Sequence, residues 1–301
     1  MNIIETDNLT RRYGRTEAVQ ALTLTVPVGS VFALLGPNGA GKTTTLKLLM
    51  NLLEPTAGSA RVLGVDSRRL GERERAQIGY VSENQQLPMW MTVTQLLDYC
   101  RPFYPTWDRD LERTLLGRFD LPLDRKLAQL SRGMLMKAAL LSSLAYRPKL
   151  LVLDEPFSGL DPLVRDEFIK GVLEVSDAGE WTVLISSHDI EEVERLADWV
   201  GMLDAGRLRI DESTESLQKR FRRVEATDVK IGATPGADWL EWEQAGALTR
   251  FIETRFTGEP SERAWRDRLG TERVTALPMT LREIFLSLTR AERAAAREAA
   301  R

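Results

Sequence analysis

The sequence predicts an α/β fold built on a mixed β-sheet flanked by helices, and three observations lead to this prediction. The stretch Val31–Leu35 is apolar at every position, which is typical of a parallel strand that is buried on both faces. A glycine-rich loop and then a helical pattern follow it directly. A second unbroken apolar run, Leu150–Leu153, ends in two carboxylates. Strands that lead through a loop into a helix are the repeating unit of α/β proteins.

The glycine-rich loop indicates what the core binds. Gly36–Thr43 reads Gly-Pro-Asn-Gly-Ala-Gly-Lys-Thr and fits the pattern G-x-x-x-x-G-K-[ST]. In such a loop the backbone N–H groups turn inward toward phosphate oxygens, and the following helix presents the positive end of its dipole to them. Lys42 can reach the β- and γ-phosphates of a nucleotide, and the Thr43 hydroxyl can ligate Mg²⁺. The loop therefore predicts a P-loop NTPase core, with a purely structural glycine turn as the alternative.

The other elements of this core follow in chain order. Residues 2–30 read as short strands, including Ile3-Ile4 and Leu22–Val28 with a turn at Tyr13-Gly14, and predict an antiparallel β subdomain. Apolar residues at positions 46, 49, 50 and 53 predict a helix that is stopped by Pro55 and Gly58. A helical, aromatic-rich insert is predicted at about 87–148. The remaining predicted elements are strands at Arg61–Val65, Ile78–Val81 and Val183–Ser186, a helix at Pro162–Val175 and a hairpin over Trp199–Ile210.

The pattern changes after about residue 212, so we expect one domain at 1–212 and a C-terminal accessory extension at 213–301. The extension reads as a small α+β unit with a basic helix at Leu217–Arg223, weakly patterned strand candidates over 224–275 and an amphipathic helix at Thr280–Leu288. The last ten residues are mostly Ala, Arg and Glu and predict a solvated or frayed helix. Two interpretations stay open for the extension, a role in dimerisation or regulation and a packing element without a separate function.

The composition limits the classes of function. The chain has 301 residues with 41 basic and 44 acidic side chains and a net charge of −3, which gives no general electrostatic reason to bind nucleic acid. The single cysteine, Cys100, excludes an internal disulfide and fits a reducing cytosol. It shares an apolar helical stripe with Val93, Leu96 and Leu97, so we expect a buried, inert thiol. Since no apolar stretch approaches the ~20 residues that cross a bilayer, and the N-terminus lacks a signal-peptide pattern, we expect a soluble chain that reaches a membrane only through a partner.

Two carboxylates follow the buried strand Leu150–Leu153. Buried acids are costly unless a cation or a water-filled site satisfies them. Asp154 suits Mg²⁺, usually through water. Glu155 can polarise an attacking water, which is the work of a general base. The alternative is a structural pair of acids that caps a helix.

Together these motifs resemble the ATP-binding subunit of an ABC transporter over roughly residues 1–210. Gly36–Thr43 is similar to the Walker A motif of that family, and Leu150–Glu155 is similar to its Walker B motif. The other motifs appear in the family's order and are an aromatic residue at Tyr13, the signature at Leu130–Met134, the D-loop at Ser158–Asp161 and a switch histidine at His188, the only histidine of the chain.

The resemblance implies ATP and Mg²⁺ as ligands and carries site residues over to this sequence. Those implied to contact ATP are Tyr13, Gly36, Pro37, Asn38, Gly39, Ala40, Gly41, Lys42, Thr43, Thr44, Ser131, Gly133 and Asp161. Those implied in catalysis are Lys42, Glu155, His188 and Glu83, and those implied near Mg²⁺ are Thr43, Asp154 and Glu83. The alternative for His188 is a purely structural role. The alternative for Tyr13 is an aromatic residue that only forms part of a turn.

Two sites depart from the family pattern. In the signature, Arg132 and Met134 replace a glycine and a glutamine, while Ser131 and Gly133, which are expected to meet the γ-phosphate across a dimer, remain. Glu83 stands where the family has the Q-loop glutamine that senses Mg²⁺ and the attacking water. We expect Glu83 to alter coupling rather than to abolish hydrolysis. The alternative is that Glu83 faces solvent and that the sensing role is absent.

The resemblance implies an ATP hydrolase that powers a separate integral-membrane permease from the cytoplasmic face of the cell membrane, as a homodimer or with a closely related subunit. Met279–Leu288 and Phe103–Asp108 resemble the bacterial subgroup that serves ABC-2-type exporters, which suggests export of drugs, peptides or lipids. The aromatic residues over Trp90–Trp107 form either a permease-docking surface or a small helical core. The alternative functions are a soluble ABC ATPase that acts on ribosomes or DNA and a low-turnover regulatory ATP-binding module.

Overall fold

The structure is a computed structural model that describes residues 1–176, 181–230 and 232–299. The chain divides into two compact units, Met1–Asp211 and Glu212–Arg301. Among the described residues, every helix is too short or too polar to cross a bilayer.

The first unit alternates strands and helices over most of its length. Its strands are β1 (Asn2–Tyr13), β2 (Thr16–Leu22), β3 (Thr25–Pro27), β4 (Val31–Leu35), β5 (Ala57–Val62), β6 (Val65–Asp66), β7 (Ile78–Ser82), β8 (Leu150–Asp154), β9 (Thr182–Ser187), β10 (Trp199–Asp204) and β11 (Arg207–Ser213). Its α-helices are α1 (Lys42–Leu49), α2 (Glu72–Arg75), α3 (Val93–Cys100), α4 (Arg109–Phe119), α5 (Arg132–Leu144), α6 (Pro162–Ser176) and α7 (Ile190–Val193).

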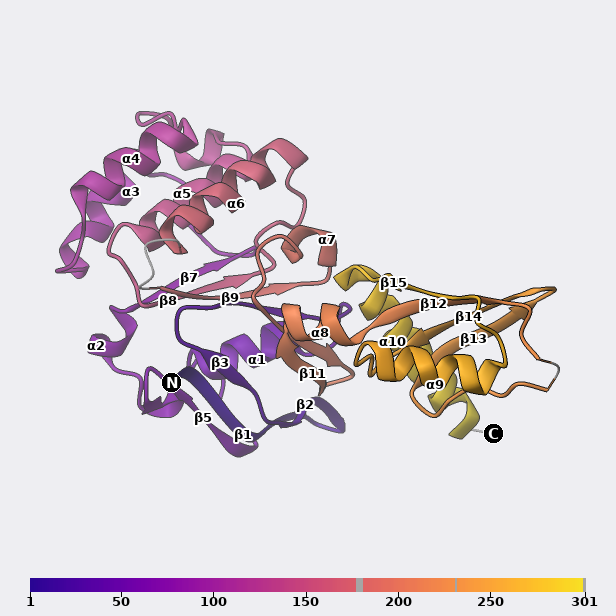
Figure 1. Ribbon diagram of the computed structural model, residues 1–301. Helices are drawn as coiled ribbons and strands as arrows, with labels where there is room; N and C mark the ends of the chain where they lie inside the picture. The colour runs from indigo at the N-terminus through magenta and orange to yellow at the C-terminus, as the bar shows by residue number, and fades with distance from the viewer. Residues whose placement is uncertain (177–180, 231, 300–301) are drawn as a thin grey trace. The chain divides into compact units, whose positions relative to one another are not determined.

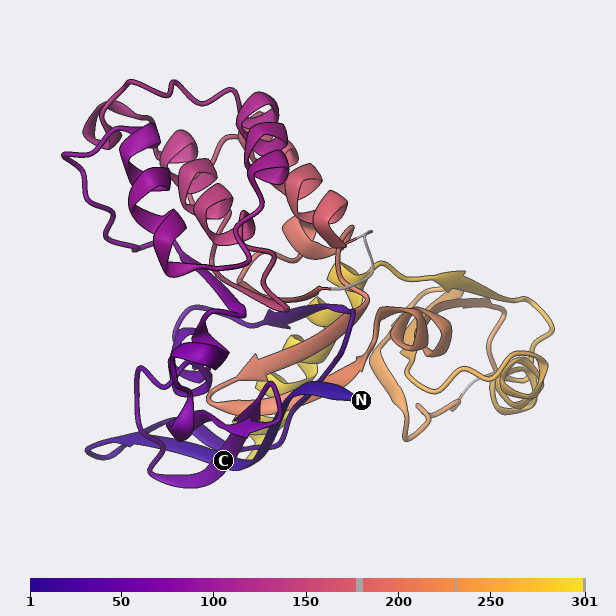
Figure 2. The same ribbon diagram turned by 90° about the vertical axis from the view of Figure 1, so that its left-hand side faces the viewer.

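A six-stranded sheet with the order β11-β10-β4-β9-β8-β7 forms the centre of this unit. Strands β10, β4, β9, β8 and β7 run parallel. Every residue of β4 and β8 is buried, as the unbroken apolar runs predict, because α5 and α6 cover one face and α1 covers the other (Figures 1 and 2). The carboxyl ends of parallel strands share one edge, so the loops after β4, β8 and β9 lie together.

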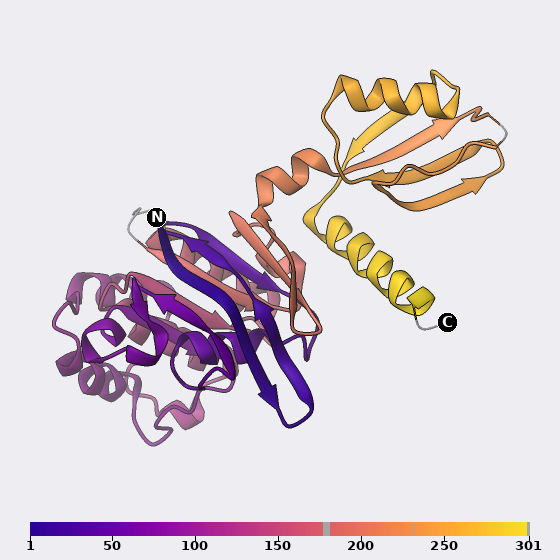
Figure 3. The ribbon, with the colours of Figure 1, turned by 90° about the horizontal axis from the view of Figure 1, so that it is seen from below.

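The N-terminal strands form the predicted antiparallel subdomain, but β1 is one strand of 12 residues rather than several short ones. Its first half pairs with β3 and its second half pairs with β2 as the long hairpin seen in Figure 3. Strand β5 pairs with β1 from Ile4 to Thr10. Asn8, with φ at 48°, marks the change of partner. The local sequence pattern did not indicate the length of β1, because part of that strand is held by pairing with β5, about fifty positions away in the chain. The strand predicted at Leu22–Val28 corresponds to β3, which is shorter, and β2 before it was not predicted.

Helix α1 is shorter than predicted and ends at Leu49 rather than near Pro55. Asn51 adopts the left-handed region with φ at 55°, and the N–H groups of Leu52 and Leu53 both donate to the carbonyl of Lys47. This backbone pattern satisfies the last carbonyls of the helix before the proline is reached. The apolar pattern in the sequence extends beyond the end of α1 because Leu53 packs on the core although it lies outside the helix.

The helical insert contains α3, α4 and α5, as predicted. Gly79 of β7 allows α5 to approach the sheet, since a Cβ there would lie 2.9 Å from the carbonyl oxygen of Ser143. The aromatic residues of the insert fall into two groups. Tyr104 and Trp107 pack around Tyr146, with the two tyrosine rings stacked at 3.7 Å between centroids. The residues that stay exposed are Trp90, Tyr99 and Phe103.

The second unit is an antiparallel sheet with helices. Its elements are α8 (Thr214–Arg220), β12 (Arg222–Thr227), β13 (Trp239–Ala245), β14 (Leu248–Glu253), α9 (Glu259–Leu269), β15 (Val274–Pro278) and α10 (Leu281–Ala299), with the sheet order β13-β14-β12-β15. Helix α9 lies along one face of this sheet (Figure 3). It was missed in the weakly patterned region, although Pro260 near its start and Gly270 after its end are typical helix boundaries. The frayed tail was predicted over the last ten residues; α10 includes those up to Ala299, and the final two lie outside the described residues.

Candidate active site

The phosphate loop connects β4 to α1 and is shaped by its glycines. Gly41 caps α1 with φ at 105°, and a Cβ there would lie 2.2 Å from the carbonyl oxygen of Ala18. Only glycine tolerates both the conformation and the contact. Lys42 is buried, and its Nζ donates to the carbonyls of Gly36 at 2.7 Å and Pro37 at 3.2 Å. Asn38, Gly39 and Thr43 are exposed, while Ala40 is buried and Thr44 is half-buried.

Asp154 ends β8 and faces the start of α1. Its Oδ1 accepts a hydrogen bond from Thr43 Oγ1 at 3.0 Å and another from Ser186 Oγ at 2.8 Å. The carboxylate is almost fully buried, so these donors offset part of its desolvation. The structure therefore brings together two of the three residues that the sequence predicts near Mg²⁺.

Glu155 lies between two of the other predicted catalytic side chains, Lys42 and His188. Its Oε1 is 3.0 Å from Lys42 Nζ, and its Oε2 is 2.7 Å from His188 Nδ1. The backbone of Glu155 adopts φ of 51°, a conformation that is costly for a residue other than glycine and that turns its side chain out of the strand direction. Side chains from the ends of β4, β8 and β9 thus meet at one point.

Ser186 belongs to the site and was missed by the sequence reasoning. Its Oγ donates to Asp154 and also accepts from the backbone N–H of Glu155 at 3.1 Å. One hydroxyl therefore holds both carboxylate residues in place. The sequence could have indicated Ser186 by its position at the end of β9, two residues before His188. That strand ends at the same sheet edge as the strand that carries Asp154.

The predicted contacts from the signature and the D-loop lie at helix starts. Ser131 caps α5, with its Oγ accepting from the Met134 N–H at 3.2 Å. Gly133 faces α6, where a Cβ would lie 2.7 Å from a methyl of Val164. Asp161 accepts from the backbone N–H groups at the start of α6. None of these described contacts joins them to Lys42 or Glu155 of the same chain.

Tyr13 ends β1 with about half of its surface exposed. The guanidinium of Arg11 lies 4.7 Å from the ring centroid, so one ring face is covered by a cation. The arrangement leaves an exposed aromatic surface, which is what stacking on a nucleobase requires.

Glu83 follows β7, and its side chain is bonded to residues other than the Walker side chains. Its Oε1 accepts from Ser158 Oγ at 2.8 Å and from Arg132 Nη2 at 2.5 Å. Burial alone would raise the pKa of this carboxyl, but the hydrogen bonds from Ser158 and Arg132 outweigh it and lower the pKa. The predicted contact of Glu83 with Mg²⁺ or water stays a prediction.

The residues present fit a magnesium nucleotide. The described residues contain no group of three or more His, Cys, Asp or Glu side chains that could cage a metal. Mg²⁺ does not need one, because it is commonly held by one or two protein oxygens together with substrate phosphates and water. The oxygens of Thr43 and Asp154 supply such a pair, and Lys42 lies buried beside them.

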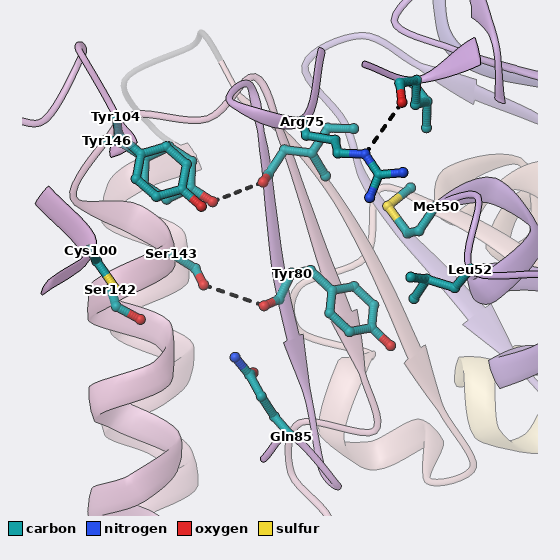
Figure 4. Close-up of a pocket in the computed structure, with 12 residues that line it drawn as sticks. Met50, Leu52, Arg75, Tyr80, Gln85, Cys100, Tyr104, Ser142, Ser143 and Tyr146 are labelled. Atoms are coloured by element: carbon teal, nitrogen blue, oxygen red, sulfur yellow. Dashed lines mark hydrogen bonds between the residues drawn. The ribbon is translucent and has the colours of Figure 1, made fainter. Parts of the chain in front are cut away.

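A cavity of about 310 Å³ lies between β7, α3 and α5 (Figure 4). Its lining residues are Met50, Leu52, Leu70, Arg75, Ile78, Tyr80, Gln85, Cys100, Tyr104, Ser142, Ser143 and Tyr146. Burial raises the pKa of the Cys100 thiol. Cys100 is half-buried at this cavity rather than fully buried as predicted.

Comparison with known proteins extends these observations. A family profile described as ABC transporter matches residues 19–158. The chain is 31% identical to the bacitracin transport ATP-binding protein of Enterococcus faecalis over 232 residues, covering 76% of this chain and 75% of that protein. It is also 31% identical to the Nod factor export ATP-binding protein I of Rhizobium leguminosarum bv. viciae over 295 residues, covering 95% and 94%. A solved structure described as the ATP-binding subunit of an ABC transporter superposes with a TM-score of 0.65 at 29% identity, covering 72% of this chain and 92% of that one.

The motifs, the P-loop core and the similarity over nearly full-length relatives agree with one another. The chain belongs to the ATP-binding subunits of ABC transporters and is an ATP hydrolase of that family.

Proposed function

We propose that this ATPase powers a separate integral-membrane exporter from the cytoplasmic face of the membrane, and that it works as a dimer. The observation that carries the proposal is the placement of Glu155 between Lys42 and His188, beside the Thr43–Asp154 pair. Hydrolysis needs a base for water, a cation for the γ-phosphate and oxygens for Mg²⁺. All three lie at one sheet edge.

In the proposed reaction, Lys42 and the loop N–H groups hold the β- and γ-phosphates of ATP. Thr43 and Asp154 hold Mg²⁺, which when bound neutralises charge on the phosphate oxygens. Glu155 accepts the proton of the attacking water or orients it. His188 keeps the Glu155 carboxylate in place through the bond at Nδ1, which leaves Nε2 free to face the γ-phosphate. Thr44 and the Tyr13 ring are proposed contacts to a phosphate and to adenine.

The proposed dimer follows from the placement of Ser131 and Gly133. Both lie at the start of α5, and the Ser131 hydroxyl and nearby N–H groups present donors suited to phosphate. Within one chain they have no described contact with the Walker residues, so we propose that they complete the ATP site of a second copy. Each nucleotide then joins two protomers, and loss of the γ-phosphate releases them.

The cavity beside β7 and the exposed aromatic residues of the insert supply a surface for the permease. Trp90, Tyr99 and Phe103 are each more than half exposed, and Tyr99 and Phe103 lie in contact at 5.5 Å between centroids. Exposed aromatic residues of this kind are typical of protein interfaces. Two relatives are named for bacitracin transport and for Nod factor export, which supports the proposed export role.

The test is to purify the chain with a co-expressed permease and to measure ATP hydrolysis and transport in proteoliposomes. We expect hydrolysis and transport together, and weaker co-purification for a Tyr99→Ala/Phe103→Ala double variant. Val28→Ala, at a comparably exposed apolar residue outside the insert, is the matched control. Association with ribosomes or DNA instead of a membrane protein would contradict the proposal.

A further inference from the structure

The two departures from the family pattern contact each other. Glu83 follows β7, and Arg132 is the first residue of α5, 49 positions later. Their side chains form an ion pair of 2.5 Å. A glutamine at position 83 would carry no charge and a glycine at position 132 would have no side chain, so the family pattern cannot form this pair. Each unusual residue is therefore explained by the other.

The same pair also contacts the D-loop. Ser158 donates to the oxygen of Glu83 that Arg132 contacts. The Arg132 guanidinium lies over Gly159, because a Cβ added there would lie 3.0 Å from Arg132 Nη1. Gly159 adopts the left-handed backbone region, with φ of 67°, at the point where the loop passes the arginine. One guanidinium thus contacts both the Q-loop and the D-loop from the start of α5.

The D-loop end of this contact leads directly to the hydrolytic residue. The Ser158 N–H donates to the Glu155 carbonyl at 3.3 Å, which closes a turn between them. Glu83 is joined to the same strand end, since its own N–H donates to the Asp154 carbonyl at 3.0 Å. The loop that carries Glu155 is therefore held from both sides, by β7 through Glu83 and by α5 through Arg132.

The pair is charged on both sides. About a quarter of the Glu83 side chain and about half of the Arg132 side chain are exposed, so solvent screens part of the interaction. Its hydrogen bonds overcome burial and lower the pKa of the carboxyl, so it is ionised at neutral pH. An arginine in a fixed contact with a carboxylate also fixes the direction of its planar guanidinium.

We propose that Glu83 and Arg132 are positioning residues for hydrolysis, and that their ion pair fixes the Glu155 loop relative to α5 within one chain. In this role Glu83 acts through the D-loop rather than as a ligand of Mg²⁺. The inference goes beyond the proposed function, since it requires ATP hydrolysis but neither the permease nor its cargo.

The experiment is a double-variant cycle on the full chain with Glu83→Gln, Arg132→Gly and the two combined. We expect kcat to fall on the order of three- to thirty-fold in each single variant, the range for coupled neighbouring side chains. The KM for ATP and the half-saturating Mg²⁺ concentration stay unchanged. The double variant, which restores the residue types of the family, retains at least the activity of the better single variant. Arg132→Lys, which keeps the charge, recovers part of the loss.

Arg113→Ala is the matched control, because Arg113 forms an exposed ion pair with Asp110 on α4. We expect wild-type kcat for it. The inference is overturned if the losses of the single variants multiply in the double variant, or if Glu83→Gln alone raises the Mg²⁺ requirement. Circular dichroism and ATP titration confirm that each variant is folded and binds nucleotide. An inactive wild-type chain would instead contradict the assigned ATPase activity, so the two failures are distinguishable.

Discussion

The two sides of the active site are built differently. On the Walker side, Lys42, Asp154 and Glu155 follow the family pattern and are bonded mainly to groups from β4, α1 and β9. On the other side, Glu83 and Arg132 depart from the pattern and are bonded to each other. The residues proposed to handle phosphate and water follow the family pattern, while the two residues proposed to position them depart from it and contact each other. In this proposal the positioning role belongs to a side-chain pair whose two members depart from the family pattern together.

The two units also use a buried carboxylate for different purposes. Asp154 lies beside the phosphate loop, where its oxygens suit Mg²⁺. Glu253 of the second unit is equally buried, but it accepts from the indole N–H groups of Trp239 at 2.9 Å and Trp265 at 3.0 Å. Its other oxygen accepts from the Arg255 N–H at 2.8 Å. This carboxylate serves the packing of an aromatic core.

The largest expected effect is on the Walker side. Glu155→Gln keeps the shape of the side chain but removes the base, so hydrolysis should fall by about 10²–10⁴-fold. ATP binding should persist, because Lys42 and the loop N–H groups are unchanged. Single-turnover hydrolysis and an ATP titration measure the two quantities. Unchanged turnover would remove Glu155 from the mechanism and place the base elsewhere.

The second effect tests the contrast between the units. Trp265→Ala removes a fully buried ring and a donor to Glu253, which should cost about 3–5 kcal/mol in the free energy of unfolding of the second unit. Calorimetry should show a lower transition for that unit, while ATP binding by the first unit is retained. Trp242→Ala, at a half-buried ring, is the control and should cost less. A concerted loss of ATP binding would show that the units do not fold separately.

The smallest effect concerns the hydroxyl that holds the two carboxylates. Ser186→Ala removes hydrogen bonds to Asp154 and Glu155, and bonds to charged groups are worth about 1.5–3 kcal/mol. We expect turnover to fall on the order of ten- to a hundred-fold, with a higher Mg²⁺ requirement. Ser287→Ala, at a buried serine bonded to the backbone of its own helix, should leave both quantities unchanged. Equal behaviour of the two variants would exclude a role for Ser186.

Much of the Walker side could be predicted from the sequence because its information is local. The loop pattern of Gly36–Thr43 and the apolar runs of β4 and β8 are each contained in a few consecutive residues. The shared edge of a parallel sheet then brings Asp154, Glu155 and His188 together without knowledge of side-chain contacts.

The rest depends on contacts between distant segments. The bond between Glu83 and Arg132 joins residues 49 positions apart, and each alone reads only as a departure from a motif. The length of β1 depends on pairing with β5, and α1 ended early because of the backbone at Asn51 rather than because of Pro55. Helix α9 was missed because only Trp265 and Leu269 of its sequence are buried, which leaves a weak apolar periodicity.

The claim that two copies share each ATP can be tested directly by mixing two inactive variants. Lys42→Ala lacks a working Walker side but keeps the signature, whereas Ser131→Arg blocks the signature and keeps the Walker side. In a mixed dimer, one of the two sites combines both intact halves. The account predicts that the mixture regains activity, up to about a quarter of the wild-type value for random pairing of equal amounts. A mixture no more active than either variant alone would contradict the shared site.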